Sequence, residues 1–221
     1  MRKLSVLMAA VAATFAMSSA QALVLVVDTF DNPAISLFDT AGGDLANAAY
    51  SDSTRTIYHE LVTPVPSNDG SFSGVKLGNN SFPTGNLQMS NADTVTSKVS
   101  LNWSLAPGFV PATGPVSFYF RVYTSDSVTK NISASIGANS IGGFAINQVT
   151  APGTTIYFPV NAGDQALLAA GGTLGMTFVG DLGWDISIDE IGFIIPEPTS
   201  LALAGLALLG AGLASRRRKA A

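Results

Sequence analysis

Carboxylates are the most plentiful side chains in this chain that could do chemistry. The 221-residue sequence has fifteen Asp and Glu residues, one histidine, His59, and no cysteine. Without cysteine there is no thiolate nucleophile, disulfide framework or Cys-based metal site. No nucleophile-elbow glycine motif accompanies His59, so a Ser-His-Asp triad is not indicated. We expect His59 to be a half-buried strand residue.

Paired carboxylates could act on sugars, because glycoside hydrolysis uses two acids on opposite sides of the glycosidic bond. Fourteen acids lie between residues 23 and 195, so some close pair is inevitable and the pattern has little specificity. A carbohydrate-active enzyme, either a glycoside hydrolase or a lyase, is therefore the alternative hypothesis for the function.

The same carboxylates could hold a calcium ion through hard oxygen ligands. The candidates lie on the first and last predicted strands, which come together in many jelly rolls: Asp28 and Asp31 on one, and Asp185, Asp189 and Glu190 on the other. Asp28 and Asp189 are the ligands we predict for this structural calcium. No EF-hand spacing is present, and solvated surface acids are the alternative. No other cofactor is predicted.

The two tryptophans could stack on sugar rings if their faces were exposed. Trp103 is in phase with Val99 and Leu101, which predicts a core position. Trp184 follows "GDLG" at the start of a strand and is the better surface candidate.

Alternating side chains predict that β-strands position these groups. In "PVSFYFRVYT", residues 115–124, apolar side chains alternate with Ser, Tyr and Arg, and residues 95–103 carry a mostly buried face. Glycine-rich turn clusters separate further candidate strands, and the one helix-like stretch is 162–172. The pattern predicts one all-β domain, an antiparallel β-sandwich or jelly roll, over residues 23–195.

The last predicted strand, "WDISIDEIGFII", changes phase. Ile186 and Ile188 share a face, but the next apolar residues in that rhythm are Ile191 and Phe193. A β-bulge at residues 189–190 would restore the core-facing pattern. Paired with the N-terminal "VLVVDTFDNP", this layout resembles the galactose-binding-like jelly rolls of extracellular modules, which implies a jelly roll but no particular ligand.

Both ends of the chain read as targeting segments. Residues 1–22 have two cations, an apolar stretch and a small-residue end at Ala22, the layout of a secretory signal peptide. At the other end a 17-residue uncharged run, 199–215, precedes four consecutive cations, which predicts a single transmembrane helix with its basic end in the cytoplasm.

The C-terminal order of Pro-Glu-Pro, apolar segment and Arg cluster resembles the PEP-CTERM sorting signal of exopolysaccharide-producing Gram-negative bacteria. The resemblance covers residues 196–221 and implies removal of the tail by an exosortase, a membrane-embedded cysteine transpeptidase. It implies that the sorting-recognition residues are Pro196, Glu197, Pro198, Arg216, Arg217 and Arg218. A permanent, unprocessed tail anchor is the alternative, since hydropathy fits both.

The charge of the body limits its partners. Residues 23–195 carry five cations and fourteen acids, a net charge of −9, which disfavours nucleic acid and anionic membrane surfaces. We predict a non-enzymatic surface or extracellular-matrix protein, exported through the inner membrane and held there transiently by its tail. Its expected partners are an exosortase and the exopolysaccharide of a biofilm.

Overall fold

The computed structural model describes residues 22–39, 47–62, 72–78, 81 and 85–196. The chain divides into two units, the body Leu25–Phe193 and a second unit made of residues 1–24 and 194–221. Almost all of the described secondary structure belongs to the body, and it consists of strands with one helix, α2.

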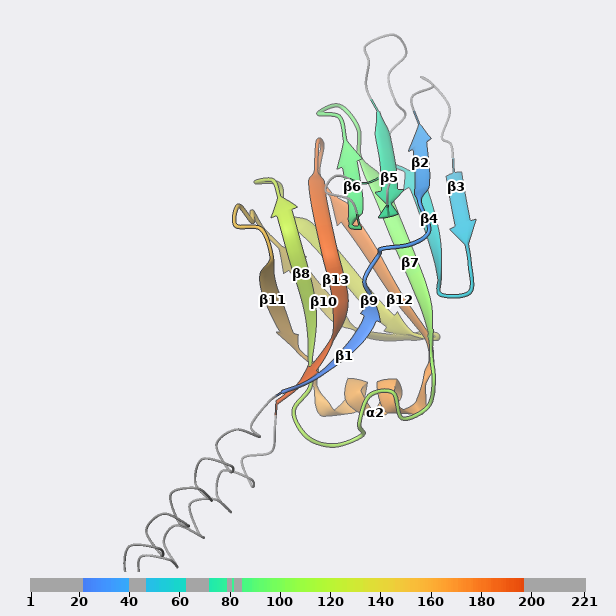
Figure 1. The fold of residues 1–221 in the computed structure, drawn as a ribbon, viewed down its shortest axis with the longest axis vertical. Helices are drawn as coiled ribbons and strands as arrows, with labels where there is room; N and C mark the ends of the chain where they lie inside the picture. The colour runs from blue at the N-terminus through green and yellow to red at the C-terminus, as the bar shows by residue number, and fades with distance from the viewer. Residues whose placement is uncertain (1–21, 40–46, 63–71, 79–80, 82–84, 197–221) are drawn as a thin grey trace, which may run out of the picture. The chain divides into compact units, whose positions relative to one another are not determined.

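The strands form two antiparallel sheets, which Figure 1 shows as two layers. The seven-stranded sheet has the order β11-β8-β13-β6-β5-β2, with β1 also pairing with β13. Its strands are β1 (Leu23–Asp28), β2 (Ile35–Asp39), β5 (Ser73–Leu77), β6 (Leu87–Asn91), β8 (Ser117–Ser125), β11 (Thr154–Pro159) and β13 (Asp185–Ile195). The six-stranded sheet, in the order β10-β9-β12-β7-β4-β3, contains β3 (Asn47–Ser51), β4 (Arg55–Leu61), β7 (Ser97–Leu105), β9 (Lys130–Ile136), β10 (Asn139–Ile146) and β12 (Gly172–Gly180).

The core lies between the two sheets and follows from the alternation in the sequence. In β7 every second residue from Ser97 to Leu105 is buried, as the pattern predicts. Phe118, Phe120 and Val122 of β8 face the core from the other sheet. The predicted antiparallel β-sandwich is therefore confirmed.

Helix α2 (Ala162–Ala170) has local causes for both of its ends. The Asn161 side chain caps the N-terminus by accepting a hydrogen bond from the Asp164 N–H at 2.9 Å. Gly171 ends the helix with a φ of 78°. An added Cβ there would lie 2.7 Å from the backbone nitrogen of Pro107, so the close approach also requires glycine.

Strand β13 shows the predicted change of phase. Ile186 and Ile188 are buried, and so are Ile191 and Phe193, while both Asp189 and Glu190 are partly exposed. Two consecutive side chains thus leave the core. The predicted pairing of the first and last strands is also confirmed, because β1 pairs with β13.

The predicted signal peptide (1–22, apart from Ala22) and the predicted transmembrane helix lie outside the described residues. In the described ranges, no helix combines the length and the apolar character that crossing a bilayer requires.

Candidate functional site

Several residues that the sequence marks as candidate site residues belong instead to the interior. His59 is 1% exposed, not half-buried as predicted, because it faces the opposite sheet. Its Nε2 lies 2.7 Å from Oγ of Ser73 on β5, and that Oγ lies 2.5 Å from the side-chain amide of Asn91. Ser73 is fully buried, so no substrate could reach its hydroxyl and Ser73 is not a nucleophile. The His59–Ser73 hydrogen bond instead links the two sheets.

Trp184 belongs to the same interior cluster. It is fully buried, so the better surface candidate of the two tryptophans is not on the surface. With the Asn91 amide oriented to satisfy both of its ends, Trp184 Nε1 donates to the amide oxygen at 2.5 Å. The indole thus has a hydrogen-bond partner for its N–H, as a buried tryptophan requires.

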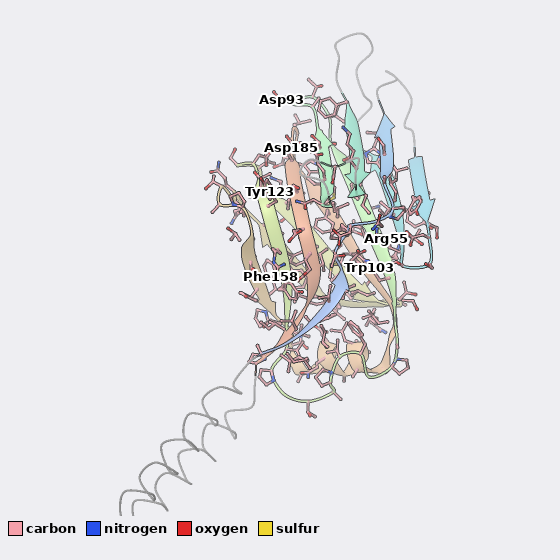
Figure 2. The ribbon with its side chains drawn as sticks, in the orientation of Figure 1. Arg55, Asp93, Trp103, Tyr123, Phe158 and Asp185 are labelled. Atoms are coloured by element: carbon pink, nitrogen blue, oxygen red, sulfur yellow. The ribbon has the colours of Figure 1, made fainter. Side chains whose placement is uncertain are left out.

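Asp28 forms a second buried polar cluster. Its carboxylate oxygens accept hydrogen bonds from Arg55 Nη2 and Trp103 Nε1, each at 2.7 Å, and from the Phe30 N–H at 2.9 Å. Arg55 also donates to the Asn32 carbonyl at 2.8 Å. Arg55 and Trp103 lie close together in Figure 2. The core position predicted for Trp103 is confirmed, since this side chain is 3% exposed.

These contacts leave the calcium prediction without support. The Asp28 oxygens already bind Arg55 and Trp103, and Asp189 pairs with Arg121 at 3.5 Å. Asp31 is exposed, and Asp185 accepts a hydrogen bond from Ser90. Among the described residues, no three His, Cys, Asp or Glu side chains lie close enough together to hold a metal ion.

The outer face of the seven-stranded sheet carries a different arrangement, which we call the tyrosine patch: Tyr119, Arg121, Tyr157, Asp189 and Glu190. Tyr157 of β11 is paired directly with Tyr119 of β8, and Arg121 is two residues further along β8. Arg121 Nη1 lies 3.5 Å from Asp189 Oδ2 and 3.4 Å from Glu190 Oε2. The change of phase in β13 places both carboxylates where Arg121 can reach them.

Tyr119 is the internal support of this patch. It is 2% exposed, and its hydroxyl donates to Glu190 Oε1. Burial, together with this hydrogen bond and the charge of Glu190, raises the pKa of Tyr119 above its usual value, so the phenol stays protonated and positions Glu190. Gly192 makes room for the ring, since an added Cβ would lie 2.8 Å from Tyr119 Cε1.

Tyr157, in contrast, is available to a ligand. Its side chain is 53% exposed, and the side chains of Arg121 and Asp189 are each 43% exposed. An exposed aromatic ring beside charged donors and acceptors can pack on the C–H face of a sugar while hydrogen bonds engage its hydroxyl groups.

The same outer face continues into a small hollow of about 150 Å³ on β5 and β6, lined by Phe72, Gly74, Lys76, Gln88 and Ser90. Lys76 is paired with Gln88, and Gln88 with Ser187 of β13, so a polar row crosses three neighbouring strands. Ser187 itself is buried and accepts a hydrogen bond from the Asn86 side chain at 2.9 Å, so the part of this row that lines the hollow is the part on β5 and β6.

The outer face of the six-stranded sheet is chemically different. One shallow depression on it, of about 500 Å³, is lined by small, uncharged residues, Ser100, Asn102, Ser135, Gly175 and Thr177 among them. No aromatic or charged side chain lines it. This depression offers hydrogen bonds without a stacking surface.

The sequence pattern contained part of the patch without identifying it. The alternation in residues 115–124 places Tyr119, Arg121 and Tyr123 on the outward side of one strand (Figure 2 labels Tyr123). Helix α2 and strand β12 separate Tyr157 from Glu190 in the sequence. No local pattern relates these two residues, because only the strand order brings β11 and β13 to the two sides of β8.

A comparison of the sequence with curated proteins finds no match. Solved structures with a similar arrangement include a CBM4 structure (15% identity, TM-score 0.42, covering 78% of this chain and 99% of that one). Another is an apo cyclase from Fischerella sp. (13% identity, TM-score 0.43, covering 82% of this chain and 100% of that one). A third is a family 11 carbohydrate-binding module of a cellulosomal cellulase from Clostridium thermocellum (15% identity, TM-score 0.36, covering 80% of this chain and 96% of that one). At this level the likeness concerns the fold.

The C-terminal segment gives the more specific match. Residues 195–219 match the family model described as the PEP-CTERM protein-sorting motif. The sorting signal predicted from the Pro-Glu-Pro and Arg residues is therefore confirmed, and the motif supports an exported surface protein that carries a signal for an exosortase.

Proposed function

We propose that this protein binds a neutral exopolysaccharide outside the cell, without catalysis, on the outer face of the seven-stranded sheet. The observation that carries the proposal is that the exposed Tyr157 ring shares one sheet face with the Arg121, Asp189 and Glu190 side chains, one strand away from Arg121 and two strands away from the carboxylates. Few sites on a protein surface combine a stacking platform with fixed donors and acceptors, and this combination suits a polyhydroxylated ligand.

The charge of the molecule supports a neutral polymer over an acidic one. The body has a net charge of −9, and the patch contributes two carboxylates against one guanidinium. A polyanion would be repelled by both. The hollow on β5 and β6, which Lys76 and Gln88 line, gives an extended chain further polar contacts on the same sheet.

The ends of the chain deliver this body to its place of action. In the proposed order of events, residues 1–22 direct export and the tail holds the protein in the inner membrane. Pro196, Glu197 and Pro198 are then recognised by the exosortase, while Arg216, Arg217 and Arg218 keep the basic end in the cytoplasm. The released body joins the cell surface or the biofilm matrix.

The alternative function is a secreted glycoside hydrolase or lyase that uses Asp189 and Glu190. A general acid must carry a proton when it meets the glycosidic oxygen. Both oxygens of Glu190 are already engaged within the patch, Oε1 by the Tyr119 hydroxyl and Oε2 by the Arg121 guanidinium, so neither faces a glycosidic oxygen alone. The arrangement therefore supports binding over hydrolysis, and release of reducing ends from a polysaccharide panel would favour the enzyme.

A binding experiment with two tyrosine variants tests the proposal. We expect the full chain to bind the host's extracellular polysaccharide, and Tyr157→Ala to weaken that binding about tenfold, the effect of losing one stacking contact. Tyr58→Ala is the matched control, since Tyr58 is 50% exposed on the outer face of the other sheet. Equal loss in both variants, or a loss only in Tyr58→Ala, would exclude the tyrosine patch as the site.

A further inference from the structure

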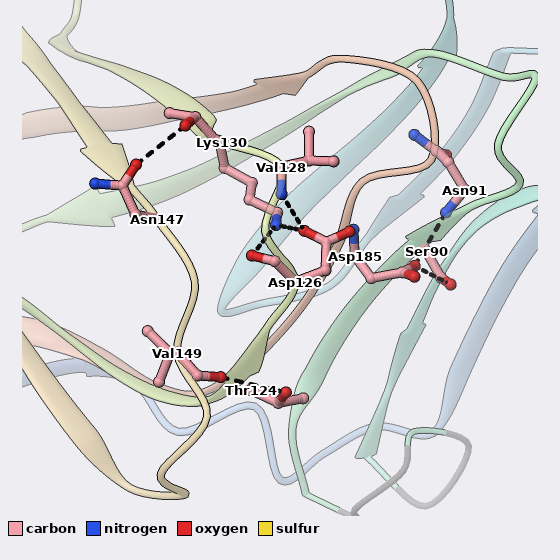
Figure 3. Close-up of polar contacts among 10 residues, drawn as sticks. Ser90, Asn91, Thr124, Asp126, Val128, Lys130, Asn147, Val149 and Asp185 are labelled. Carbon is pink, nitrogen blue, oxygen red and sulfur yellow. Dashed lines mark hydrogen bonds and ion pairs between the residues drawn. The ribbon is translucent and has the colours of Figure 1, made fainter.

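Lys130, the first residue of β9, has a charged side chain with no access to solvent. Its side chain is 0% exposed, whereas that of its partner Asp126 is 29% exposed. Lys130 Nζ directly contacts Asp126 Oδ1 and also lies 3.3 Å from the Asp126 carbonyl oxygen (Figure 3). The amine and the carboxyl group are thus held together in the turn that joins β8 to β9.

Burial increases the neutral, nucleophilic fraction of the Lys130 amine relative to that of an exposed lysine. Desolvation lowers the pKa of Lys130 to about 8, although the nearby charge of Asp185 acts in the opposite direction. A neutral amine is therefore accessible near physiological pH, as in lysines that act as nucleophiles.

The carboxyl group of Asp126 is held by two backbone N–H groups. Val128 donates to Oδ1 at 3.1 Å, and Asp185 donates to Oδ2 at 2.9 Å. N–H donors on both oxygens of a carboxyl group stabilise the negative charge that these oxygens carry when a nucleophile attacks the carboxyl carbon. Ser90 and the Asn91 N–H in turn hold the Asp185 side chain, which fixes the start of β13 beside the turn (Figure 3).

We propose that Lys130 and Asp126 form an intramolecular amide bond. The Lys130 ammonium gives one proton to the Asp126 carboxylate, and the neutral Nζ attacks Cγ to form the N–C bond. The bond from Cγ to one oxygen then breaks, and that oxygen leaves as water with the two protons that the nitrogen has lost. The reaction is a condensation, so it needs no oxidant, reductant or further reactant.

The position of this bond gives it a structural role. β8 belongs to the seven-stranded sheet and β9 to the six-stranded sheet, so the turn from Asp126 to Lys130 crosses from one layer to the other. An amide there would fasten the crossing covalently in a chain that has no cysteine for a disulfide. The ring is short, so its effect on the entropy of the unfolded chain is small and its main effect is local.

Peptide mapping of the full-length, unprocessed protein by mass spectrometry tests the bond, because the next tryptic site after Lys130 is Arg216 in the C-terminal segment. Trypsin should cut after Arg121 but not after Lys130. The peptide that begins at Val122 and continues past Lys130 should be lighter than its sequence by one water molecule. Cleavage after Lys130 in the wild-type protein, with a mass equal to the sequence, would overturn the proposal.

Lys130→Arg is the control that separates this bond from other losses of water. Arginine keeps the positive charge beside Asp126, but its guanidinium stays protonated and does not condense. We expect the full sequence mass in Lys130→Arg and in Asp126→Ala. A loss of water that persists in Lys130→Arg would identify a cyclic imide at Asp126–Ser127 and would also overturn the proposal. If either variant fails to fold, the wild-type peptide alone decides.

Discussion

At the scale of single residues, exposure to water decides how much an ion pair contributes to the stability of this protein. The pair of Arg55 and Asp28 lies in the core, with side-chain exposures of 4% and 2%, while the pair of Lys98 and Glu60 lies on the surface with 41% and 51%. Each charge of a buried ion pair needs its partner and its hydrogen bonds, because no water replaces them. The charges of an exposed pair are hydrated even when the pair is broken, so that pair contributes little to stability.

Asp28→Asn should therefore destabilise the fold strongly. The change removes the charge that compensates buried Arg55, and we expect it to lower the free energy of unfolding by about 3 kcal/mol. The matched change Glu60→Gln should cost less than about 1 kcal/mol, because that pair is exposed. Urea denaturation of both variants measures this difference, and similar midpoints would show that the Asp28 cluster does not stabilise the core.

Exposure to water also distinguishes the roles of the two tyrosines in the tyrosine patch. Tyr157 and Tyr119 are direct partners, yet one is 53% exposed and the other 2%. We expect Tyr119→Phe to weaken polysaccharide binding less than Tyr157→Ala, because Tyr119 acts only by positioning Glu190. Binding isotherms of the two variants, compared with Tyr58→Ala, give this order. The reverse order would place Tyr119 in contact with the ligand.

Among the elements, strand β13 organises the body. It lies between β8 and β6, pairs with β1, and carries both Asp185 at its start and the two carboxylates of the patch. Gly192 in this strand lets the β1 backbone and the Tyr119 ring approach closely, since an added Cβ would contact Leu25 O and lie 2.9 Å from Tyr119 Oη.

Gly192→Ala should disturb this packing. Overpacking of this kind costs about 1–3 kcal/mol, so we expect a lower melting temperature and weaker polysaccharide binding as Tyr119 and Glu190 move. Gly143→Ala in β10 is the control, because its added Cβ would meet the Ile132 carbonyl oxygen at an ordinary 3.5 Å. Thermal melts of the two variants test the prediction, and an unchanged Gly192→Ala protein would contradict it.

At the scale of the whole molecule, the body and the ends have separate tasks. The body has a net charge of −9, and the cations of the chain concentrate in the two terminal segments. The sorting motif at residues 195–219 directs the protein, while the sandwich carries the surface that we propose for binding.

The intact mass of protein recovered outside cells of the native host tests how the ends are used. We expect a chain that lacks residues 1–22 and the segment after Pro198, and any additional mass would reveal a group attached on processing. A chain that still ends at Ala221 and stays in the inner membrane would instead indicate a permanent tail anchor.

The sequence by itself determined the C-terminal sorting motif, the fold class and the phases of the strands. A sorting motif is a contiguous stretch, so its residues can be read without knowing the fold, and the alternation that buries Val99, Leu101 and Trp103 is local to one strand. Only the tertiary structure decided which strands are neighbours. That order buried His59 against Ser73, enclosed Trp184, gave Asp28 to Arg55 and brought Tyr157 beside Tyr119. These contacts join residues far apart in the chain, and their energies depend on packing between the sheets, which no local pattern contains.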